Sequence, residues 1–318
     1  MRLRYTGATY LRTLALMTGE VSPEGVELEY EAGQPNALFR RTFAGDCAEA
    51  SELSASNTII GRARGDQRFA VLPVFPSRVF RHNTIYVNVD AGIERPEDLR
   101  GKRVGVPQYC QSANIWVRGF LQHDYGVTPE SIRWVRLREE MLPDCLPAGV
   151  DITQAPPGSS LSNMLEAGEL DALISLEKPA CLDAGSPHVR RLFPDYAQAE
   201  AEYYRRTGHF PIMHLVILRR DVYEADRSLA RRFYDAFVGA KERSYAADHH
   251  TSHLVSNFPL HVAYMEQSQA LFGNDPFPYG VAQNRHTLEA LMQYLYEQGF
   301  TDRVLTMDEL IVPELLDT

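Results

Sequence analysis

The chain has 318 residues, of which 44% are hydrophobic and 23% are charged, and its formal net charge is −10. This length is sufficient for two lobes, and the composition is that of an ordinary globular protein. A protein that binds a nucleic-acid backbone needs a basic face, so the acidic balance argues against nucleic acid as a partner. The sequence has no run of about 18 apolar residues, which argues against a membrane-spanning helix.

The N-terminal segment and the cysteines bear on the compartment. Arg2 and Arg4 precede an apolar patch at 11–17 that is too short and too interrupted for a secretory signal, and no small-residue cleavage site follows it. The four cysteines show no C-x-x-C spacing and no disulfide-framework density, so we expect reduced thiols. Together these features predict a cytoplasmic location.

Short strand patterns alternate with helical patterns along the chain, which predicts an α/β fold. In chain order, the patterns predict strands at 1–5, 26–30, 103–106 and 171–174, and helices at 11–18, 36–43, 112–124 and 161–165. Two longer β-rich runs, 83–89 and 212–219, bracket a middle segment. We therefore expect a two-lobed protein with a two-strand hinge and a cleft between the lobes. Lobe 1 is expected to comprise residues 1–88 and 212–318, and lobe 2 the inserted residues 89–211.

The segment that precedes the first of these runs contains Arg78, Arg81 and His82. Arginines beside a histidine at the start of a strand suit a small carboxylated ligand that must be held and protonated. The alternative for such a segment is solvated loop charge. We interpret Arg78 and Arg81 as carboxylate-binding residues and His82 as a candidate proton donor.

A second candidate segment follows the predicted strand 103–106, where the chain turns into a helix. Its polar residues are Gln108, Tyr109, Gln111 and Ser112. Backbone N–H groups at a helix N-terminus bind anions, and ligands of open α/β sheets lie at the carboxyl ends of strands. The alternative is an ordinary turn in which Ser112 caps the helix. We expect these four residues to contribute to substrate binding.

The small polar segment at 50–56 contains Ser51, Glu52 and Ser54, where a strand is expected to end in the cleft. The two serines are candidate donors to a carboxylate. Glu52 is a candidate base for a phenol, or the partner that orients a histidine, and its alternative is a solvated carboxylate. His214, near the start of the second β-rich run, is either a core histidine or a catalyst. Tyr279 precedes the last amphipathic helix and is either a site residue or part of the turn before that helix, with Asn284 as the helix cap.

Another pair of histidines has the spacing of metal ligands. His249 and His253 stand at i and i+4, but no H-E-x-x-H motif accompanies them, so a solvated helix face is the preferred interpretation.

Several segments together resemble one family. They are Phe75 to His82, Gly101 to Pro107, Trp116 to Gly119, Arg190 to Tyr196, Phe210 to His214 and Pro278 to Gly280. In this order, and over nearly the whole chain, they resemble the 4,5-dihydroxyphthalate decarboxylases. That family is similar in architecture to type II periplasmic solute-binding proteins, so the resemblance implies this fold and a carboxy-lyase activity on a hydroxylated aromatic acid.

Non-oxidative decarboxylation of a hydroxybenzoate needs an acid at the ipso carbon, a base for the phenol and a clamp for the remaining carboxylate. We assign catalysis to His214, His82 and Glu52, and substrate binding to the arginines and the other polar residues named above. No cofactor is required; a divalent metal held by Glu52, His82 and His214 is the chemical alternative. The alternative of another class is a binding or sensing protein for an aromatic carboxylate. A homo-oligomer is expected on general grounds.

Overall fold

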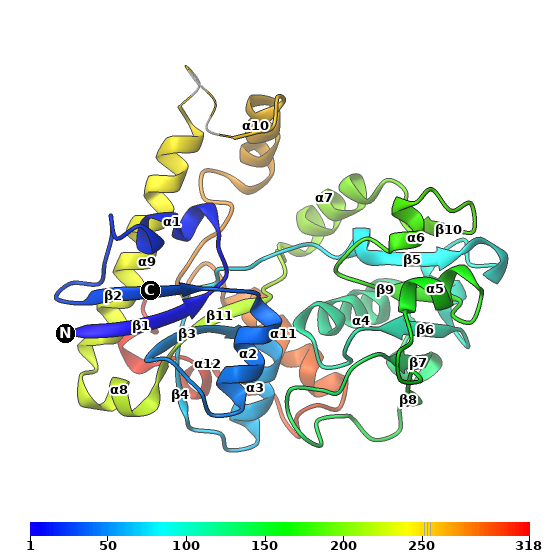
Figure 1. The fold of residues 1–318 in the computed structure, drawn as a ribbon, viewed down its shortest axis with the longest axis horizontal. Helices are drawn as coiled ribbons and strands as arrows, with labels where there is room; N and C mark the ends of the chain where they lie inside the picture. Colours follow the sequence, from blue (N-terminus) through cyan, green and yellow to red (C-terminus); the bar gives the residue numbers. More distant parts are fainter. Residues whose placement is uncertain (251, 253, 255) are drawn as a thin grey trace. The chain divides into compact units, whose positions relative to one another are not determined.

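The computed structural model describes residues 1–250, 252, 254 and 256–318, and Figure 1 shows its fold. The chain divides into two compact units. The first unit comprises Met1–Arg78, Ile212–Glu289 and Leu305–Thr318, and the second comprises Val79–Pro211 and Ala290–Val304. The chain therefore leaves the first unit and returns to it twice.

These bounds differ from the expected lobes at two places. The run at 83–89 was assigned to lobe 1, but strand β5 (Ile85–Asn88) is antiparallel to β9 (Ala172–Ile174) and β10 (Val189–Arg191) of the second unit. The segment 290–304 also belongs to the second unit. The apolar pattern of a strand indicates that the strand is buried, but it does not indicate which sheet the strand joins. The sequence pattern therefore could not assign the run at 83–89 to one unit or the other.

The two β-rich runs that were expected at the hinge belong to different sheets. The two β-rich runs are not paired with each other, because β5 lies in the second sheet and β11 (His214–Arg219) lies in the first. A single antiparallel bridge between Arg78 and Ile212 stands where the chain leaves the first unit and returns to it.

The first unit is built on a five-stranded mixed sheet (Figure 1). Its strands in spatial order are β2 (Glu27–Ala32), β1 (Arg2–Gly7), β3 (Ala50–Ser54), β11 and β4 (Phe69–Leu72). β1 is parallel to β2 and β3, whereas β11 is antiparallel to β3 and β4. Every residue of β3 is buried, including its charged member Glu52. The centre of this sheet therefore places a carboxylate in the interior.

The remaining regular elements of the first unit are helices. They are α1 (Leu14–Met17), α2 (Pro35–Phe43), α3 (Ala55–Ala63), α8 (Arg220–Ala225), α9 (Ser228–Asp248), α10 (His261–Phe272) and α12 (Met307–Leu310). The expected helix at 36–43 is confirmed as α2, whose first residue is a proline with its fixed φ. α11 (Arg285–Glu297) begins in the first unit and ends in the second.

The second unit contains a six-stranded sheet. Its strands in spatial order are β10, β5, β9, β6 (Arg103–Val106), β7 (Arg133–Arg136) and β8 (Ile152–Gln154). Its helices are α4 (Ser112–Tyr125), α5 (Leu161–Glu166), α6 (Ala180–Asp183) and α7 (Tyr196–Thr207). The expected strand at 103–106 and helix at 112–124 are confirmed as β6 and α4. α4 is followed by Gly126, whose φ of 65° is the left-handed conformation that suits the end of a helix.

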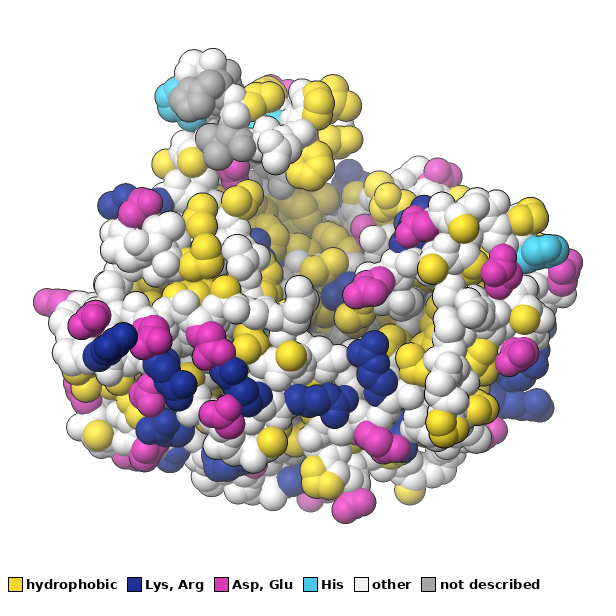
Figure 2. Space-filling view, viewed as in Figure 1, with side chains coloured by type: hydrophobic (Ala, Val, Ile, Leu, Met, Phe, Trp, Pro, Cys, Tyr) yellow, Lys and Arg dark blue, Asp and Glu magenta, His cyan; other side chains and the backbone are white. Residues whose placement is uncertain are grey.

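On the face that Figure 2 shows, acidic and basic side chains are interspersed. Helix α10 is more exposed than the other long helices of the first unit, because none of its twelve residues is buried. Hydrophobic side chains gather over it (Figure 2). His253 lies outside the described residues, so the spacing it shares with His249 is left as a sequence observation. Within the described part of the chain, no helix is both long and apolar enough to cross a membrane.

Candidate active site

Two neighbouring strands of the first sheet place Glu52 and His214 on the same face. In the antiparallel register of β3 and β11, His214 lies opposite Ser54 and Glu52 lies opposite Val216. Residues two apart on a strand share a face, so Glu52 and His214 are diagonal neighbours across the two strands. The Nδ1 atom of His214 lies 2.5 Å from Oε1 of Glu52.

Glu52 is fully buried, and both of its carboxylate oxygens are hydrogen-bonded. Oε1 accepts from the Tyr10 hydroxyl at 2.6 Å as well as contacting His214, and Oε2 accepts from the backbone N–H of Ala8 at 2.7 Å. Burial by itself raises the pKa of Glu52, but the hydrogen bonds and the charge of His214 outweigh it and hold the pKa below its usual value. The carboxylate is therefore ionised at neutral pH in spite of its burial.

Tyr10 is a site residue that the sequence analysis did not identify. It follows β1, which is the parallel neighbour of β3, so the segment after β1 lies beside the side chains of β3. The pKa of Tyr10 is raised by burial and by the nearby charge of Glu52, so its phenol stays protonated and donates. Its position after a parallel strand was the available signal, because carboxyl ends of parallel strands meet at one edge of a sheet.

The ring of His214 is held on one side and open on the other. Phe39 of α2 contacts it edge to face, with ring centroids 4.9 Å apart and planes at 90°. Nδ1 faces Glu52, whereas Nε2 has no hydrogen-bond partner among residues 1–250, 252, 254 and 256–318. The side chain is 19% exposed. A histidine with one nitrogen on a buried carboxylate and the other unpaired is arranged to exchange a proton at Nε2.

Arg12 is a second residue of this region that the sequence analysis did not select. Its guanidinium lies over the ring of Tyr10, with Cζ 4.6 Å from the centroid, and over the ring of Phe277 at 4.0 Å. Its Nε donates to the carbonyl oxygen of Pro76 at 2.9 Å. Stacking between two aromatic rings fixes the plane of the guanidinium, and the half-buried side chain retains a positive charge close to Tyr10.

Tyr279 lies in the first unit and is buried, with a hydroxyl that has no hydrogen-bond partner in the described part of the chain. Burial raises the pKa of this phenol, and Arg12 opposes the shift while the carboxylates of Asp275 and Glu52 add to it. The Nζ atom of the buried Lys241 lies 4.6 Å from the centroid of its ring. Tyr279 is thus a neutral phenol in the electrostatic neighbourhood of Glu52.

Arg78 is also buried in the first unit. Its Nη1 donates to the Oδ1 atom of Asn284 at 2.6 Å and to the carbonyl oxygen of Pro278 at 3.4 Å. These bonds join the segment at the unit boundary to the turn that contains Tyr279. Asn284 itself donates to the carbonyl oxygens of Pro278 and Gly280, so the turn is held from both sides.

The two serines beside Glu52 have partners of their own. The Ser51 hydroxyl accepts from Thr6 at 3.0 Å, and its position next to Glu52 in the strand turns it to the opposite face of the sheet. The Ser54 hydroxyl caps α3, because it accepts from the side-chain nitrogen of Asn57 at 3.0 Å and from its backbone N–H.

Arg81 and His82 belong to the second unit. His82 is buried, stacks on Phe120 with ring centroids 4.3 Å apart, and contacts Phe193 and Tyr203. Burial lowers its pKa to about 4, so it is neutral at physiological pH. Burial also lowers the pKa of Arg81 to about 10, against the charge of Glu200. The surroundings of His82 are those of a core residue, as the aromatic contacts replace water on its ring.

The polar residues of the turn before α4 lie in the second unit as well. Gln108 is buried and donates to the carbonyl oxygen of Glu139 at 2.6 Å, and Tyr109 lies under the guanidinium of Arg118, with Cζ 3.8 Å from its ring centroid. Gln111 is the residue that precedes α4, and Ser112 is the first residue of that helix. The expected site residues are thus divided between the units, and within the first unit the structure brings Glu52, His214 and Tyr10 together.

The fold is shared with solved structures of solute-binding proteins. The periplasmic aliphatic sulphonate binding protein of Escherichia coli aligns with 100% of this chain and 99% of its own, at a TM-score of 0.53 and 16% identity. The alkanesulfonate-binding protein of Xanthomonas axonopodis, bound to MOPS, aligns over 98% and 96% of the two chains, at a TM-score of 0.53 and 14% identity. The NMT1/THI5-like family model matches residues 22–174. The protein is therefore of the periplasmic-binding-protein-like fold class, with two mixed α/β sheets.

Sequence relatives define the family more closely. A 4,5-dihydroxyphthalate decarboxylase of Comamonas testosteroni is 36% identical over 324 residues, which span 100% of this chain and 98% of the relative. A 4,5-dihydroxyphthalate decarboxylase of Pseudomonas putida is 39% identical over 215 residues, or 66% of this chain and 83% of the relative. The chain belongs to the 4,5-dihydroxyphthalate decarboxylase family.

Proposed function

We propose that the protein is a carboxy-lyase that decarboxylates a hydroxylated aromatic dicarboxylic acid, with 4,5-dihydroxyphthalate as substrate and protocatechuate and CO2 as products. The observation that carries the proposal is the 2.5 Å contact between His214 and the buried carboxylate of Glu52, with Nε2 of His214 unpaired within the described residues. Membership of the decarboxylase family supports the reaction class and the substrate.

The reaction needs one proton at carbon and one electron pair from the ring. A hydroxyl para to the departing carboxylate directs electron density to the ipso carbon, which takes a proton from the protonated His214. The bond to the carboxylate then breaks, its electron pair restores the aromatic ring, and CO2 leaves. One proton is consumed for each CO2 that is released, and His214 regains its proton from solvent. Neither an oxidant nor a reductant is needed.

The residues of the first unit are assigned to these steps as follows. Nε2 of His214 delivers the proton, and Glu52 orients the ring and stabilises the positive charge that the imidazole carries before transfer. Tyr10 donates to Glu52 and so holds the carboxylate in place. Arg12, whose guanidinium is fixed between two aromatic rings, supplies positive charge for a substrate carboxylate.

Arg78 and Tyr279 remain part of the proposal, and Arg78 donates to the turn that contains Tyr279. Ser51 and Ser54 remain predictions from the sequence. The predicted residues of the second unit, namely Arg81, His82, Gln108, Tyr109, Gln111 and Ser112, also remain predictions. No cofactor is included, because the ring hydroxyl itself supplies the electron density. The cytoplasmic location and a homo-oligomeric state likewise remain predictions from the sequence.

The test compares three histidine variants with 4,5-dihydroxyphthalate as substrate and CO2 and protocatechuate as readouts. His214→Gln should lower kcat by about 10²-fold or more with a small change in KM, because general-acid catalysis contributes about 10²–10⁴-fold. The matched control is His286→Gln, an exposed histidine of the first unit, which should retain wild-type kcat. His82→Gln tests the other candidate proton donor, and it should retain a kcat much closer to that of the wild type than His214→Gln does.

Three results would contradict the proposal. Wild-type turnover in His214→Gln would remove His214 from the chemistry, and binding of the substrate without turnover by the wild-type protein would favour a binding or sensing function. Activity that disappears with a chelator and returns with a divalent cation would favour the metal alternative with Glu52 and His214 as ligands.

A further inference from the structure

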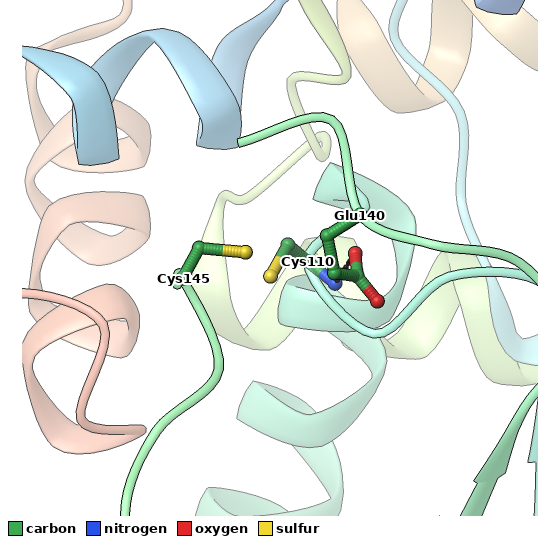
Figure 3. A group of neighbouring side chains, drawn as sticks. All are labelled: Cys110, Glu140 and Cys145. Atoms are coloured by element: carbon green, nitrogen blue, oxygen red, sulfur yellow. Dashed lines mark hydrogen bonds between the residues drawn. The ribbon is translucent and has the colours of Figure 1, made fainter. Parts of the chain in front are cut away.

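A cluster of metal-binding side chains lies in the second unit, apart from every residue assigned to proton transfer. Its members are Cys110, Glu140 and Cys145. The two sulfur atoms and a carboxylate oxygen all lie within 4.8 Å of one another, and this is the one such group of three found in the described residues. Figure 3 shows the two thiol groups pointing toward each other with the carboxylate of Glu140 beside Cys110.

Two separate segments bring these donors together. Cys110 stands in the turn between β6 and α4, whereas Glu140 and Cys145 belong to the loop between β7 and β8. Both cysteines are buried, and the side chain of Glu140 is 5% exposed. Residue Asp144, directly before Cys145, has a φ of 51°, a left-handed conformation that turns the loop at this point. The donors therefore converge in a site from which bulk water is largely excluded.

The carboxylate of Glu140 is already fixed by its surroundings. Its two oxygens accept the backbone N–H groups of Tyr109 and Cys110 at 2.7 and 2.9 Å, and Arg136 lies 3.8 Å away. Metal-binding carboxylates are commonly held by such hydrogen bonds, which orient the ligand and leave further lone pairs for the cation. These contacts also tie the loop to the residues that flank Cys110.

We propose that Cys110, Glu140 and Cys145 form a binding site for zinc, with water at the fourth tetrahedral position. Zinc takes thiolate and carboxylate ligands together, at about 2.3 Å and 2.0–2.2 Å, which sets donor separations of roughly 3.5–3.8 Å. The present separations of up to 4.8 Å require only a small contraction of the loop. A disulfide would use the two sulfurs alone and would give Glu140 no part.

Charge balance also favours zinc at this buried position. Binding follows Zn²⁺ + 2 RSH → Zn(SR)₂ + 2 H⁺, so the cation replaces two thiol protons and the net charge of the site does not change. Arg136 lies beside the carboxylate, and Arg118 donates to the carbonyl oxygen of Tyr109 at 3.0 Å. The net charge beside Arg136 and Arg118 is therefore the same whether the two thiols carry their protons or the two thiolates bind one zinc ion.

The test uses Co²⁺ as a spectroscopic probe on the reduced, chelator-treated full-length protein. Wild-type protein should bind one equivalent and develop thiolate-to-cobalt charge transfer with the strong visible bands of tetrahedral Co²⁺, and Zn²⁺ should displace it. Cys110→Ser and Cys145→Ser should lose the charge-transfer band. The matched control is Cys181→Ser, a buried cysteine of the same unit outside the cluster, which should retain it.

A second variant guards against misfolding of the serine variants. Glu140→Gln keeps the size of the side chain, and should bind zinc at least about tenfold more weakly while retaining the thiolate band at saturation. Zn²⁺ should also raise the Tm of the wild-type protein and of Cys181→Ser. The proposal is overturned if wild-type protein shows no thiolate band. It is equally overturned if both serine variants keep the band, or if the two thiols close a disulfide in place of binding Co²⁺.

Discussion

Glu52 and His214 are 162 positions apart in the chain, yet their side chains are 2.5 Å apart because β3 and β11 are antiparallel neighbours. The carboxylate is completely buried and the imidazole is partly exposed. The pair thus joins the interior of the first unit to its surface. The buried carboxylate is fixed by two further donors from the segment after β1, the Tyr10 hydroxyl and the Ala8 N–H, and the partly exposed imidazole has its Nε2 atom available.

Removing the charge of Glu52 should affect both stability and turnover. In Glu52→Gln the amide nitrogen takes the place either of Oε1, which faces His214 and the Tyr10 hydroxyl, or of Oε2, which accepts from the Ala8 N–H. At Oε2 a donor would then meet a donor, and at Oε1 the charge that pairs with His214 is lost; an unsatisfied buried group costs about 1–3 kcal/mol. We expect kcat to fall about 10²-fold or more, since the imidazole loses its orienting charge. Steady-state kinetics and urea unfolding measure the two effects. Glu49→Gln, at a half-buried carboxylate just before β3, should leave kcat unchanged; an equal loss there would show a general electrostatic effect.

Tyr10→Phe should cost more stability than Tyr30→Phe. Both hydroxyls donate at 2.6 Å, Tyr10 to the carboxylate of Glu52 and Tyr30 to the carbonyl oxygen of Ala8. A hydrogen bond to a charged group contributes about 1.5–3 kcal/mol and one between neutral groups about 0.5–1.5 kcal/mol. Urea unfolding of the two variants measures the difference. Equal losses would indicate that Tyr10 does not stabilise an ionised Glu52.

His82 should make the folded protein sensitive to acid. Its pKa is about 4 in the folded state because of burial, and about 6.5 in an unfolded chain, so the unfolded state binds more protons between these values. Stability is complete above pH 6.5 and falls as the pH drops toward 4, with about 2.5 kcal/mol lost by pH 4.5. His82→Phe preserves the aromatic stacking on Phe120. Its free energy of unfolding should therefore fall by about 2.5 kcal/mol less than that of the wild type when the pH is lowered to 4.5.

Unfolding at pH 7.0 and 4.5 provides this comparison. Other titratable groups contribute equally to the acid sensitivity of the wild type and of His82→Phe, so their contributions cancel when the two changes in unfolding free energy are subtracted. Identical pH dependence of the two proteins would mean that His82 binds its proton in the folded state.

Gly119 should be intolerant of a methyl group, unlike Gly239. A Cβ atom at Gly119 of α4 would lie 2.2 Å from the ring of Tyr294, whereas at Gly239 of α9 its nearest neighbour would be Val21 at 3.9 Å. Overpacking costs about 1–3 kcal/mol, while alanine in place of glycine in a helix gains roughly 0.5–1 kcal/mol. Thermal unfolding should therefore show Gly119→Ala less stable and Gly239→Ala slightly more stable than the wild type. A neutral Gly119→Ala would mean that Tyr294 moves aside without cost.

Local patterns in the sequence predicted individual elements well. The apolar run that became β6 and the spacing that became α4 depend on residues next to one another or one turn apart, and a helix or strand is decided largely at that range. The same applies to α2, with its proline at the first position. Glu52 and His214 were also identified from the sequence, because a carboxylate within a small polar segment where a strand is expected to end, and a histidine near the start of a β-rich run, stand out chemically.

The tertiary structure decided which of these residues meet. Strand order and register bring Glu52 to His214 and place Tyr10 beside them, and no local pattern encodes a contact between segments so far apart. The same non-local pairing puts β5, and with it His82, into the second unit, where aromatic side chains enclose the ring. The sequence by itself determined the kinds of elements and the chemically distinctive residues, because these depend on neighbouring side chains. Which residues share a site was determined only by the packing of distant strands, because burial and hydrogen bonding are properties of the assembled sheet.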